Sequence, residues 1–156
     1  IGVFVRYPKT ALPKRPKIPK KESARDTRGG RIMKFRAIRE NHLYQKAYAK
    51  GKRAVMPSVA VYLLPDYAAK RLAKAHPEKR TVNRIGLTVS KKLGGAVVRS
   101  RTRRILREGL RTLMKERPMK TGFLIVIAAR AAALPKKSTE IRRELEIAFE
   151  KLGMFK

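Results

Sequence analysis

Residues 84–108 read RIGLTVSKKLGGAVVRSRTRRILRE and contain the clearest structural pattern in the chain. Over 84–90, apolar side chains alternate with small or polar ones, which is typical of a β-strand with one buried face. The residues expected to face the core are Ile85, Leu87 and Val89, with Gly86, Thr88 and Ser90 on the opposite face. The segment 91–95 follows as a loop that leads into a helix.

That helix is predicted over about 96–115 and ends before Pro118, which cannot continue it. At about 100° per residue, its side chains separate into two arcs. The apolar arc consists of Val98, Ile105, Leu106, Leu110 and Leu113. The basic arc consists of Arg101, Arg103, Arg104, Arg107, Arg111 and Lys115. One side is therefore expected to bury against a sheet. Arg99 falls on the apolar side, so we expect it in a frayed first turn.

The basic arc indicates a polyanionic partner. Neighbouring arginines repel one another and weaken an isolated helix. A merely solvated face would more often mix Glu with Lys, yet Glu108 is the only acid over 96–115. Arginine also binds phosphate through two donors and stacks on bases. We interpret this helix as a nucleic-acid contact, and its geometry alone does not separate RNA from DNA.

Further elements are expected on either side of this segment. A short amphipathic helix is predicted over 38–50, a strand over 58–64 and a partner strand over 54–57. The apolar run 122–128 predicts a strand that is covered on both faces.

A last helix is expected from Lys137 or Ser138 to Leu152, with Ser138 as its N-cap. Its core-facing residues are Ile141, Leu145, Ala148, Phe149 and Leu152. The order α-β-β-β-α-β-α predicts an α+β fold, a two-layer sandwich of one sheet with helices packed on it.

The chain is expected to form one RNA-binding domain over 33–156. Residues 1–32 are basic and proline-rich, and we predict a disordered tail there. Residues 66–82 are charged and contain Pro77, so they are predicted to form an inserted long loop.

Composition limits the class of protein. A net charge of +30 calls for a large anionic partner, and nucleic acid fits best because Lys and Arg release counterions from phosphates. An anionic membrane is the alternative, but it favours bulky aromatic boundary residues, and aromatics make up only 6% of this chain. No apolar run is long enough to span a bilayer and no secretory signal is recognised, so a cytoplasmic location is expected.

No catalytic residue and no metal ligand set are predicted. The chain has no Cys, which excludes disulfides, thiolate zinc sites and a Cys nucleophile. His42 and His76 are isolated, and the acids cluster on the last helix without ligand spacing. We therefore expect binding rather than bond cleavage, with no cofactor bound by the protein alone and no small-molecule substrate.

Residues 86–108 closely resemble the signature of the bacterial ribonuclease P protein subunit: a strand, Ser-Lys-Lys, a loop of small residues and then closely spaced arginines. Ser100 stands where that family generally has Asn, which leaves the contact of the Asn amide in doubt. Residues 39–44 and 48–53 look like the first helix and the following turn of the family. The resemblance extends over roughly 33–152, whereas the tail and 66–82 have no place in the usual pattern.

The resemblance implies a left-handed βαβ crossover from the 84–90 strand to the 122–130 strand, similar to domain 2 of ribosomal protein S5. It also implies a function as the protein component of the endoribonuclease that removes the 5′ leader of precursor tRNA. The expected partners are ribonuclease P RNA and precursor tRNA. In that family the RNA subunit carries the active site and its Mg²⁺ ions.

Two RNA-binding surfaces are expected. The residues assigned to the catalytic RNA are Lys91, Lys92, Arg99, Ser100, Arg101, Arg103, Arg104, Arg107 and Arg111. The residues assigned to the leader are Tyr44, Tyr48, Lys52, Arg53 and Tyr62. Tyrosine rings stack on unpaired bases without regard to sequence. For Tyr44 and Tyr48, simple core packing is an equal alternative.

Three other classes of nucleic-acid-binding protein are alternatives to this interpretation. A ribosomal protein that binds rRNA is the main alternative, because such proteins are equally small and basic. A double-stranded-RNA-binding domain lacks the strand and helix expected after residue 118. A major-groove DNA reader would carry Asn or Gln among the basic residues of its helix, and 96–115 has neither.

Overall fold

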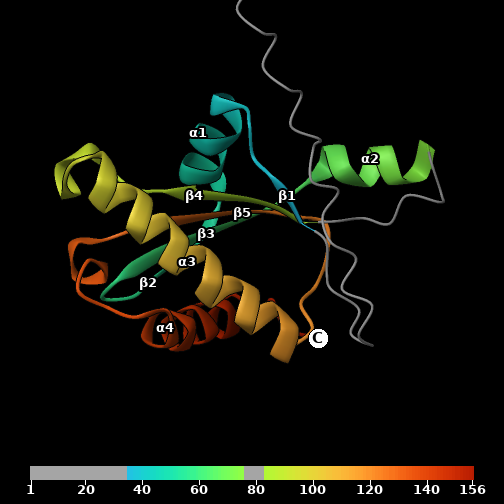
Figure 1. The fold of residues 1–156 in the computed structure, drawn as a ribbon. Helices are drawn as coiled ribbons and strands as arrows, with labels where there is room; N and C mark the ends of the chain where they lie inside the picture. Colours follow the sequence, from blue (N-terminus) through green and yellow to red (C-terminus); the bar gives the residue numbers. More distant parts are fainter. Residues whose placement is uncertain (1–34, 76–82) are drawn as a thin grey trace, which may run out of the picture.

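The computed structural model describes residues 35–75 and 83–156 (Figure 1). The predicted tail over 1–32 and the last part of the predicted loop, 76–82, lie outside the described residues. No helix in the described ranges is both long and apolar enough to cross a membrane.

A single five-stranded sheet forms the centre of the molecule, with the strand order β1-β4-β5-β3-β2. The strands are β1 (Phe35–Ala37), β2 (Lys52–Val55), β3 (Val59–Pro65), β4 (Asn83–Thr88) and β5 (Phe123–Ala129). The helices are α1 (Asn41–Lys50), α2 (Tyr67–Ala75), α3 (Ala96–Glu116) and α4 (Ser138–Lys151), with two short 3₁₀ turns, η1 (Lys91–Leu93) and η2 (Ala131–Ala133). β4 lies parallel to β1 and β5, whereas β3 lies antiparallel to β5 and β2.

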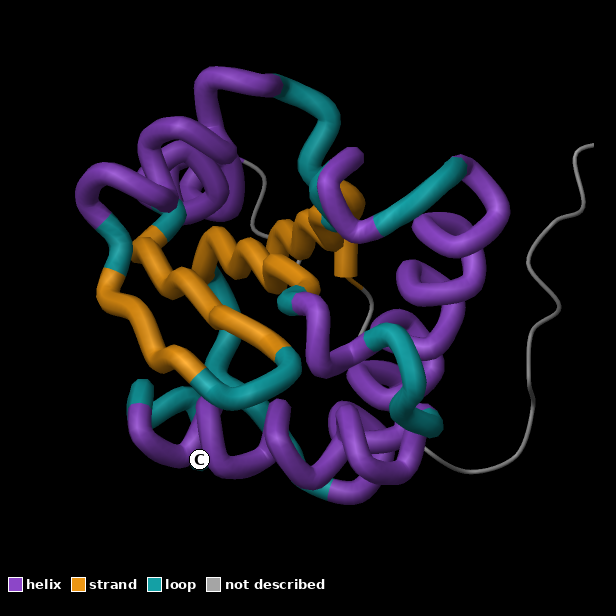
Figure 2. Tube along the Cα trace, turned by 90° about the vertical axis from the view of Figure 1, so that its left-hand side faces the viewer, coloured by secondary structure: helices purple, strands orange, loops and turns teal. Residues whose placement is uncertain are grey.

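Helices cover both faces of this sheet (Figures 1 and 2). On one face, α3 and α4 bury the larger core together with Val61 of β3 and Ile125 of β5. On the other face, α1 covers a smaller cluster that includes Leu124 and Val126 of the same β5. The mixed α+β class with one sheet is as predicted, but the molecule has three layers rather than two because both faces of β5 are apolar. The prediction that this strand is covered on both sides is confirmed.

The alternation over 84–90 is confirmed. Ile85 and Val89 are buried in the core beneath α3, and Leu87 packs against it. Gly86 and Thr88 face α1, whose tyrosines lie over them.

Two elements were missed. Residues 67–75 form helix α2 instead of a loop, and the carboxylate of Asp66 accepts a hydrogen bond from the Ala69 N–H at 3.2 Å, as an N-cap does. β1 adds three residues at the sheet edge and was not predicted, because pairing with β4 rather than local pattern defines it. The expected order is thus wrong at these two points.

Several boundaries also differ from expectation. The first helix begins at Asn41 rather than Ile38, which instead is buried beneath it. The partner strand is Lys52–Val55 rather than 54–57, because the chain already turns at Met56. Ser138 is the first residue of α4 and not its cap; there the Glu140 carboxylate accepts a hydrogen bond from the Lys137 N–H at 2.9 Å.

Candidate nucleic-acid interface

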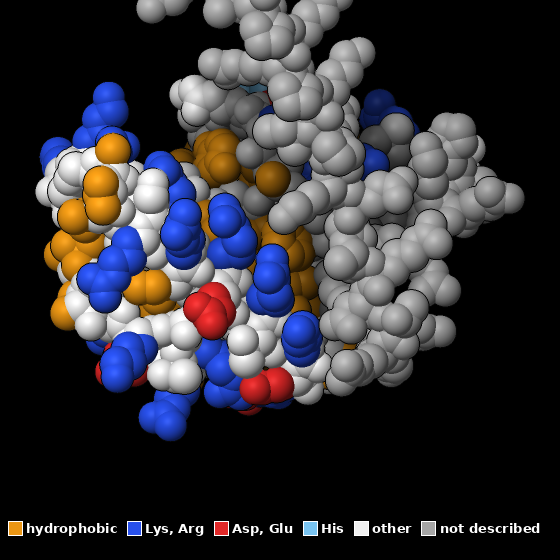
Figure 3. Space-filling view, viewed as in Figure 1, with side chains coloured by type: hydrophobic (Ala, Val, Ile, Leu, Met, Phe, Trp, Pro, Cys, Tyr) orange, Lys and Arg blue, Asp and Glu red, His pale blue; other side chains and the backbone are white. Residues whose placement is uncertain are grey.

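A ridge of guanidinium groups runs along α3. We define the arginine ridge as Arg99, Arg101, Arg103, Arg104, Arg107 and Arg111. All are exposed except Arg99 and Arg103, which are half-buried. Figure 3 shows Lys and Arg side chains following this helix across one face of the molecule. Within residues 35–75 and 83–156, no carboxylate lies within 4.0 Å of a ridge guanidinium. In this part of the chain, the positive charge of the ridge is therefore not neutralised by ion pairs.

Packing on the opposite side of α3 fixes the direction of the ridge. Leu106, Leu110 and Leu113 are buried, as predicted from their spacing. Gly109 lies against α4 so closely that an added Cβ would come within 3.0 Å of the Ser138 carbonyl oxygen. The helix cannot rotate about its axis without breaking these contacts. Val98 was expected in the core, but it is 41% exposed, because the first turn of α3 extends past the sheet.

Arg99 does not lie in a frayed first turn, although its position on the apolar side of the helix predicted this. Its backbone N–H donates to the Gly95 carbonyl at 3.0 Å, so the helix is regular there. Its side chain is half-buried, and the Nε atom is buried without a hydrogen-bond partner in the described part of the chain. A buried donor without a partner costs free energy until an acceptor reaches it.

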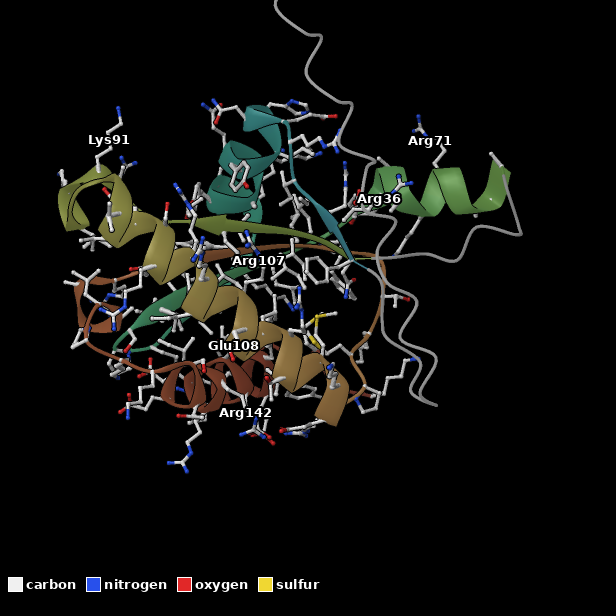
Figure 4. The ribbon with its side chains drawn as sticks, viewed as in Figure 1. Arg36, Arg71, Lys91, Arg107, Glu108 and Arg142 are labelled. Atoms are coloured by element: carbon white, nitrogen blue, oxygen red, sulfur yellow. The ribbon has the colours of Figure 1, made fainter. Side chains whose placement is uncertain are left out.

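The loop before α3 presents further cations. Lys91 and Lys92 are exposed on η1, and Ser100 is exposed one turn into the helix. Gly94 has φ 146°, a backbone conformation that favours glycine and lets the chain turn into the helix. Figure 4 shows Lys91 at the end of the sheet where α3 begins, with Arg107 farther along the ridge.

Tyr44 packs as a core residue. Its ring lies over Gly86, where an added Cβ would come within 2.4 Å of the tyrosine Cε1 atom, and its hydroxyl donates to the Ile38 carbonyl at 3.4 Å. Burial raises the pKa of Tyr44 above its ordinary value of 10.0, Tyr48 adds to the rise, and the positive charge of Arg103 opposes it.

Tyr48 and Tyr62 remain open to a ligand. Tyr48 is 42% exposed, its ring meets that of Tyr62 edge to face at 4.7 Å, and its hydroxyl lies 3.0 Å from Thr88 Oγ1. We call Tyr48 and Tyr62 the tyrosine pair. Arg53 lies directly across from Tyr62 in the β2–β3 ladder and therefore shares its face. Lys52 lies across from Leu63, whose side chain belongs to the α3–α4 core, so Lys52 is on the other face.

Three arginines near β1 were missed from the sequence. Arg36, Arg39 and Arg84 line an open cavity of about 560 Å³ together with Glu40 and Leu43. Arg36 is the register partner of Arg84 in the parallel β1–β4 ladder, a proximity that no local pattern reveals.

Asp66 holds Arg84 in place. Arg84 donates from Nε to Asp66 Oδ2 at 2.5 Å and from Nη2 to Oδ1 at 2.8 Å. Burial alone would raise the pKa of Asp66, but hydrogen bonds from Arg84 and from the Ala69 and Ala68 backbone outweigh it and lower the pKa below its ordinary 3.8. The hydrogen bond to Asp66 in turn raises the pKa of Arg84. The pair is charged at neutral pH and ties the start of α2 to β4.

These side chains can bind phosphates and stack on bases. Among the described residues there is no group of three or more His, Asp or Glu side chains that could hold a metal ion. The arrangement is therefore typical of a nucleic-acid-binding surface, with cations along a helix and aromatic rings at the adjacent sheet.

Known proteins share this chain's sequence and fold. The family model described as Ribonuclease P matches residues 32–153. A ribonuclease P protein component from Clostridium acetobutylicum is 34% identical over 122 residues, which are 78% of this chain and 92% of that relative. The corresponding component from Symbiobacterium thermophilum is 34% identical over 71% of this chain and 85% of its own length. The solved structure of the Staphylococcus aureus RNase P protein aligns with a TM-score of 0.59 at 25% identity, over 77% of this chain and 97% of that chain. The matched range 32–153 spans the positions of the arginine ridge and of the tyrosine pair.

Proposed function

The chain belongs to the family of ribonuclease P protein components, and on that premise we propose that it clamps precursor tRNA onto ribonuclease P RNA while the RNA cuts the 5′ leader. The observation that carries this proposal is the arginine ridge, a row of guanidiniums without ion pairs among the described residues and supported by buried leucines on the opposite side of α3. The family assignment favours this function over that of a ribosomal protein.

The arginine ridge, with Lys91, Lys92 and Ser100, is assigned to the ribonuclease P RNA. Two polyanions repel each other, and a strongly basic protein between them screens that repulsion. Arginine suits this role because its planar guanidinium binds phosphate through two donors. We also propose that the β4–α3–β5 crossover is left-handed, as the family resemblance implies.

The tyrosine pair, with Arg53, is assigned to the single-stranded leader of precursor tRNA. Tyr48 is 42% exposed and can reach a base, and Arg53 lies beside Tyr62 on the same face of the sheet. The packing of Tyr44 against Gly86 supports a role in forming the floor beside this site rather than in stacking. Lys52, on the other face, has no part in it.

Hydrolysis itself is assigned to the RNA subunit. Mg²⁺ bound by that RNA would supply the activated water and stabilise the leaving oxygen. The protein contributes binding and position, and its own residues move no proton.

A cleavage assay tests the whole proposal. Multiple-turnover cleavage of precursor tRNA by a matching ribonuclease P RNA at low Mg²⁺ is expected to be slow without the protein and fast with it. Raising the Mg²⁺ concentration should reduce the difference between the two cleavage rates, because the ions then screen the repulsion between the two RNAs. Cleavage by the protein alone, after removal of all RNA by nuclease and high salt, would contradict the assignment of catalysis to RNA.

The leader contact has its own prediction. The substitution Tyr62→Ala or Tyr48→Ala should weaken holoenzyme binding of leader-bearing precursor by about 1–3 kcal/mol, the usual value for one stacked base. Binding of mature tRNA, which lacks the leader, should hardly change. Tyr48→Phe is the matched control, since it keeps the ring and loses only the hydroxyl near Thr88. Equal losses for precursor and mature tRNA would rule out stacking on the leader.

A further inference from the structure

A second group of cations lies at the far end of the sheet from Lys91. Lys70, Arg71 and Lys74 are exposed on α2, and Arg36 is exposed on β1. Figure 4 shows Arg36 and Arg71 together at this end of the molecule. We call these four residues and Arg39 the α2 patch. None of them forms an ion pair within the part of the chain that the structure describes.

The α2 patch is built onto the sheet. Arg84, the register partner of Arg36, donates hydrogen bonds from Nε and Nη2 to the Asp66 carboxylate at 2.5 and 2.8 Å. Asp66 also accepts a hydrogen bond from the Ala69 N–H in the first turn of α2. The start of α2 is therefore fixed next to the cavity of about 560 Å³ that Arg36 and Arg39 line. The cations of α2 and those of the cavity form one surface.

The α2 patch and the tyrosine pair lie near opposite ends of the α1 face of β4. Arg84, Gly86 and Thr88 succeed one another on the α1 face of β4, because alternate residues of a strand share a face. Arg84 lies at the cavity, Gly86 under the ring of Tyr44, and Thr88 beside the hydroxyl of Tyr48. From Arg84 to Thr88 is four residues, or about 13 Å along the strand. A strand of RNA seated on the tyrosine pair meets the α2 patch within a few nucleotides.

We propose that the α2 patch binds backbone phosphates of the leader, at nucleotides farther from the cleavage site than those on the tyrosine pair. This inference rests on the proposed leader contact. Exposed Lys and Arg side chains suit a flexible, phosphate-rich strand of any sequence. Tyr67, at the start of α2 and 68% exposed, offers one further ring for stacking. The leader is favoured over the ribonuclease P RNA because Arg84 at the patch and Thr88 at the tyrosine pair lie on one face of β4. The patch also lies opposite the end of the sheet that carries Lys91.

A series of leader lengths tests this inference. Holoenzyme assembled with the full chain is titrated with precursor tRNAs whose leaders are shortened stepwise from a long one to none. For the unsubstituted protein, affinity should rise in two stages, first as the leader covers the tyrosine pair and again as it reaches α2. The triple substitution K70A/R71A/K74A should remove only the second stage. The loss is expected to be about ten-fold for the longest leader, and the salt slope should fall by about 2.

A matched control comes from α4 and its N-cap residue Lys137, on the other face of the sheet. The triple substitution K137A/R143A/K151A removes the same charge from exposed positions and should leave both stages intact. Alanine is the best helix former, so α2 should persist, and circular dichroism checks this.

The possible outcomes separate this inference from the proposed function. An unchanged second stage in the α2 variant overturns the inference while the first stage still supports the tyrosine contact. Equal losses in the α2 and α4 variants also overturn it, because they indicate a general charge effect. A loss of affinity for ribonuclease P RNA alone, without dependence on leader length, assigns the patch to that RNA instead. If affinity does not depend on leader length even with the unsubstituted protein, the leader contact fails and the inference fails with it.

Discussion

Replacing Arg103 and Arg107 together by alanine is expected to weaken binding of ribonuclease P RNA by about 30-fold near 0.15 M salt. The two residues are four positions apart, one helical turn, on α3 and lie on the same side of that helix. Each phosphate contact adds about 0.9 to the slope of log K against log salt, so the loss of two should flatten it by about 1.8. A filter-binding or fluorescence titration over a range of salt concentrations measures both quantities.

The control for this variant is the double substitution R143A/K151A on α4. It removes the same charge from exposed positions away from the ridge, so it should change affinity and slope far less. If the two double variants behave alike, the ridge contributes only through net charge and does not dock the RNA. Neither pair of substitutions touches the buried leucines of α3, so the fold should be retained.

The substitution Asp66→Ala is expected to lower the free energy of unfolding by about 3 kcal/mol. The Asp66 side chain is 3% exposed and that of Arg84 is 23% exposed, so the variant leaves a largely buried guanidinium without its partner. The N-cap of α2 is lost as well, which typically costs about 1 kcal/mol. Urea unfolding at pH 7 measures the change. The double variant D66A/R84M should recover part of it, because no buried charge then remains without a partner.

The pH dependence of the same variant follows from the lowered pKa of Asp66. A carboxyl whose pKa is lower in the folded state stabilises the fold above its unfolded pKa, near 3.8, and loses that contribution as the pH falls through the folded value. The difference in stability between the unsubstituted protein and Asp66→Ala should therefore be constant near neutral pH and shrink below about pH 4. Glu144 also has a lowered pKa: burial would raise it, but hydrogen bonds from Lys136 and Ser58 prevail. A difference that grows in acid would contradict the assigned role of Asp66.

The elements that could be predicted are those whose pattern is local. The two arcs of 96–115 predicted the buried face of α3 correctly except for Val98, and the apolar run of β5 correctly indicated cover on both sides. Helix α2 is not predicted from the sequence, because a charged stretch that contains Pro77 is also typical of a loop. Asp66 nevertheless occupies the N-cap position of this helix. β1 is too short to carry a pattern of its own and exists through its pairing with β4.

The candidate site divides in the same way. The ridge followed from helical spacing, and its contact with RNA stays a prediction. The separate fates of Tyr44 and Tyr48 depend on Gly86 and Thr88, which lie about forty residues along the chain. The cavity of Arg36, Arg39 and Arg84 likewise depends on the β1–β4 pairing, so spacing within the sequence gave no sign of it.

The close fit of Tyr44 on Gly86 links the evolution of two distant positions. Because a single methyl group at residue 86 would overlap the ring, a chain that gains bulk there must give up bulk at residue 44 to keep its first helix seated. Related chains should therefore exchange size between these positions as a pair, because added bulk at residue 86 alone would lift the helix off the sheet.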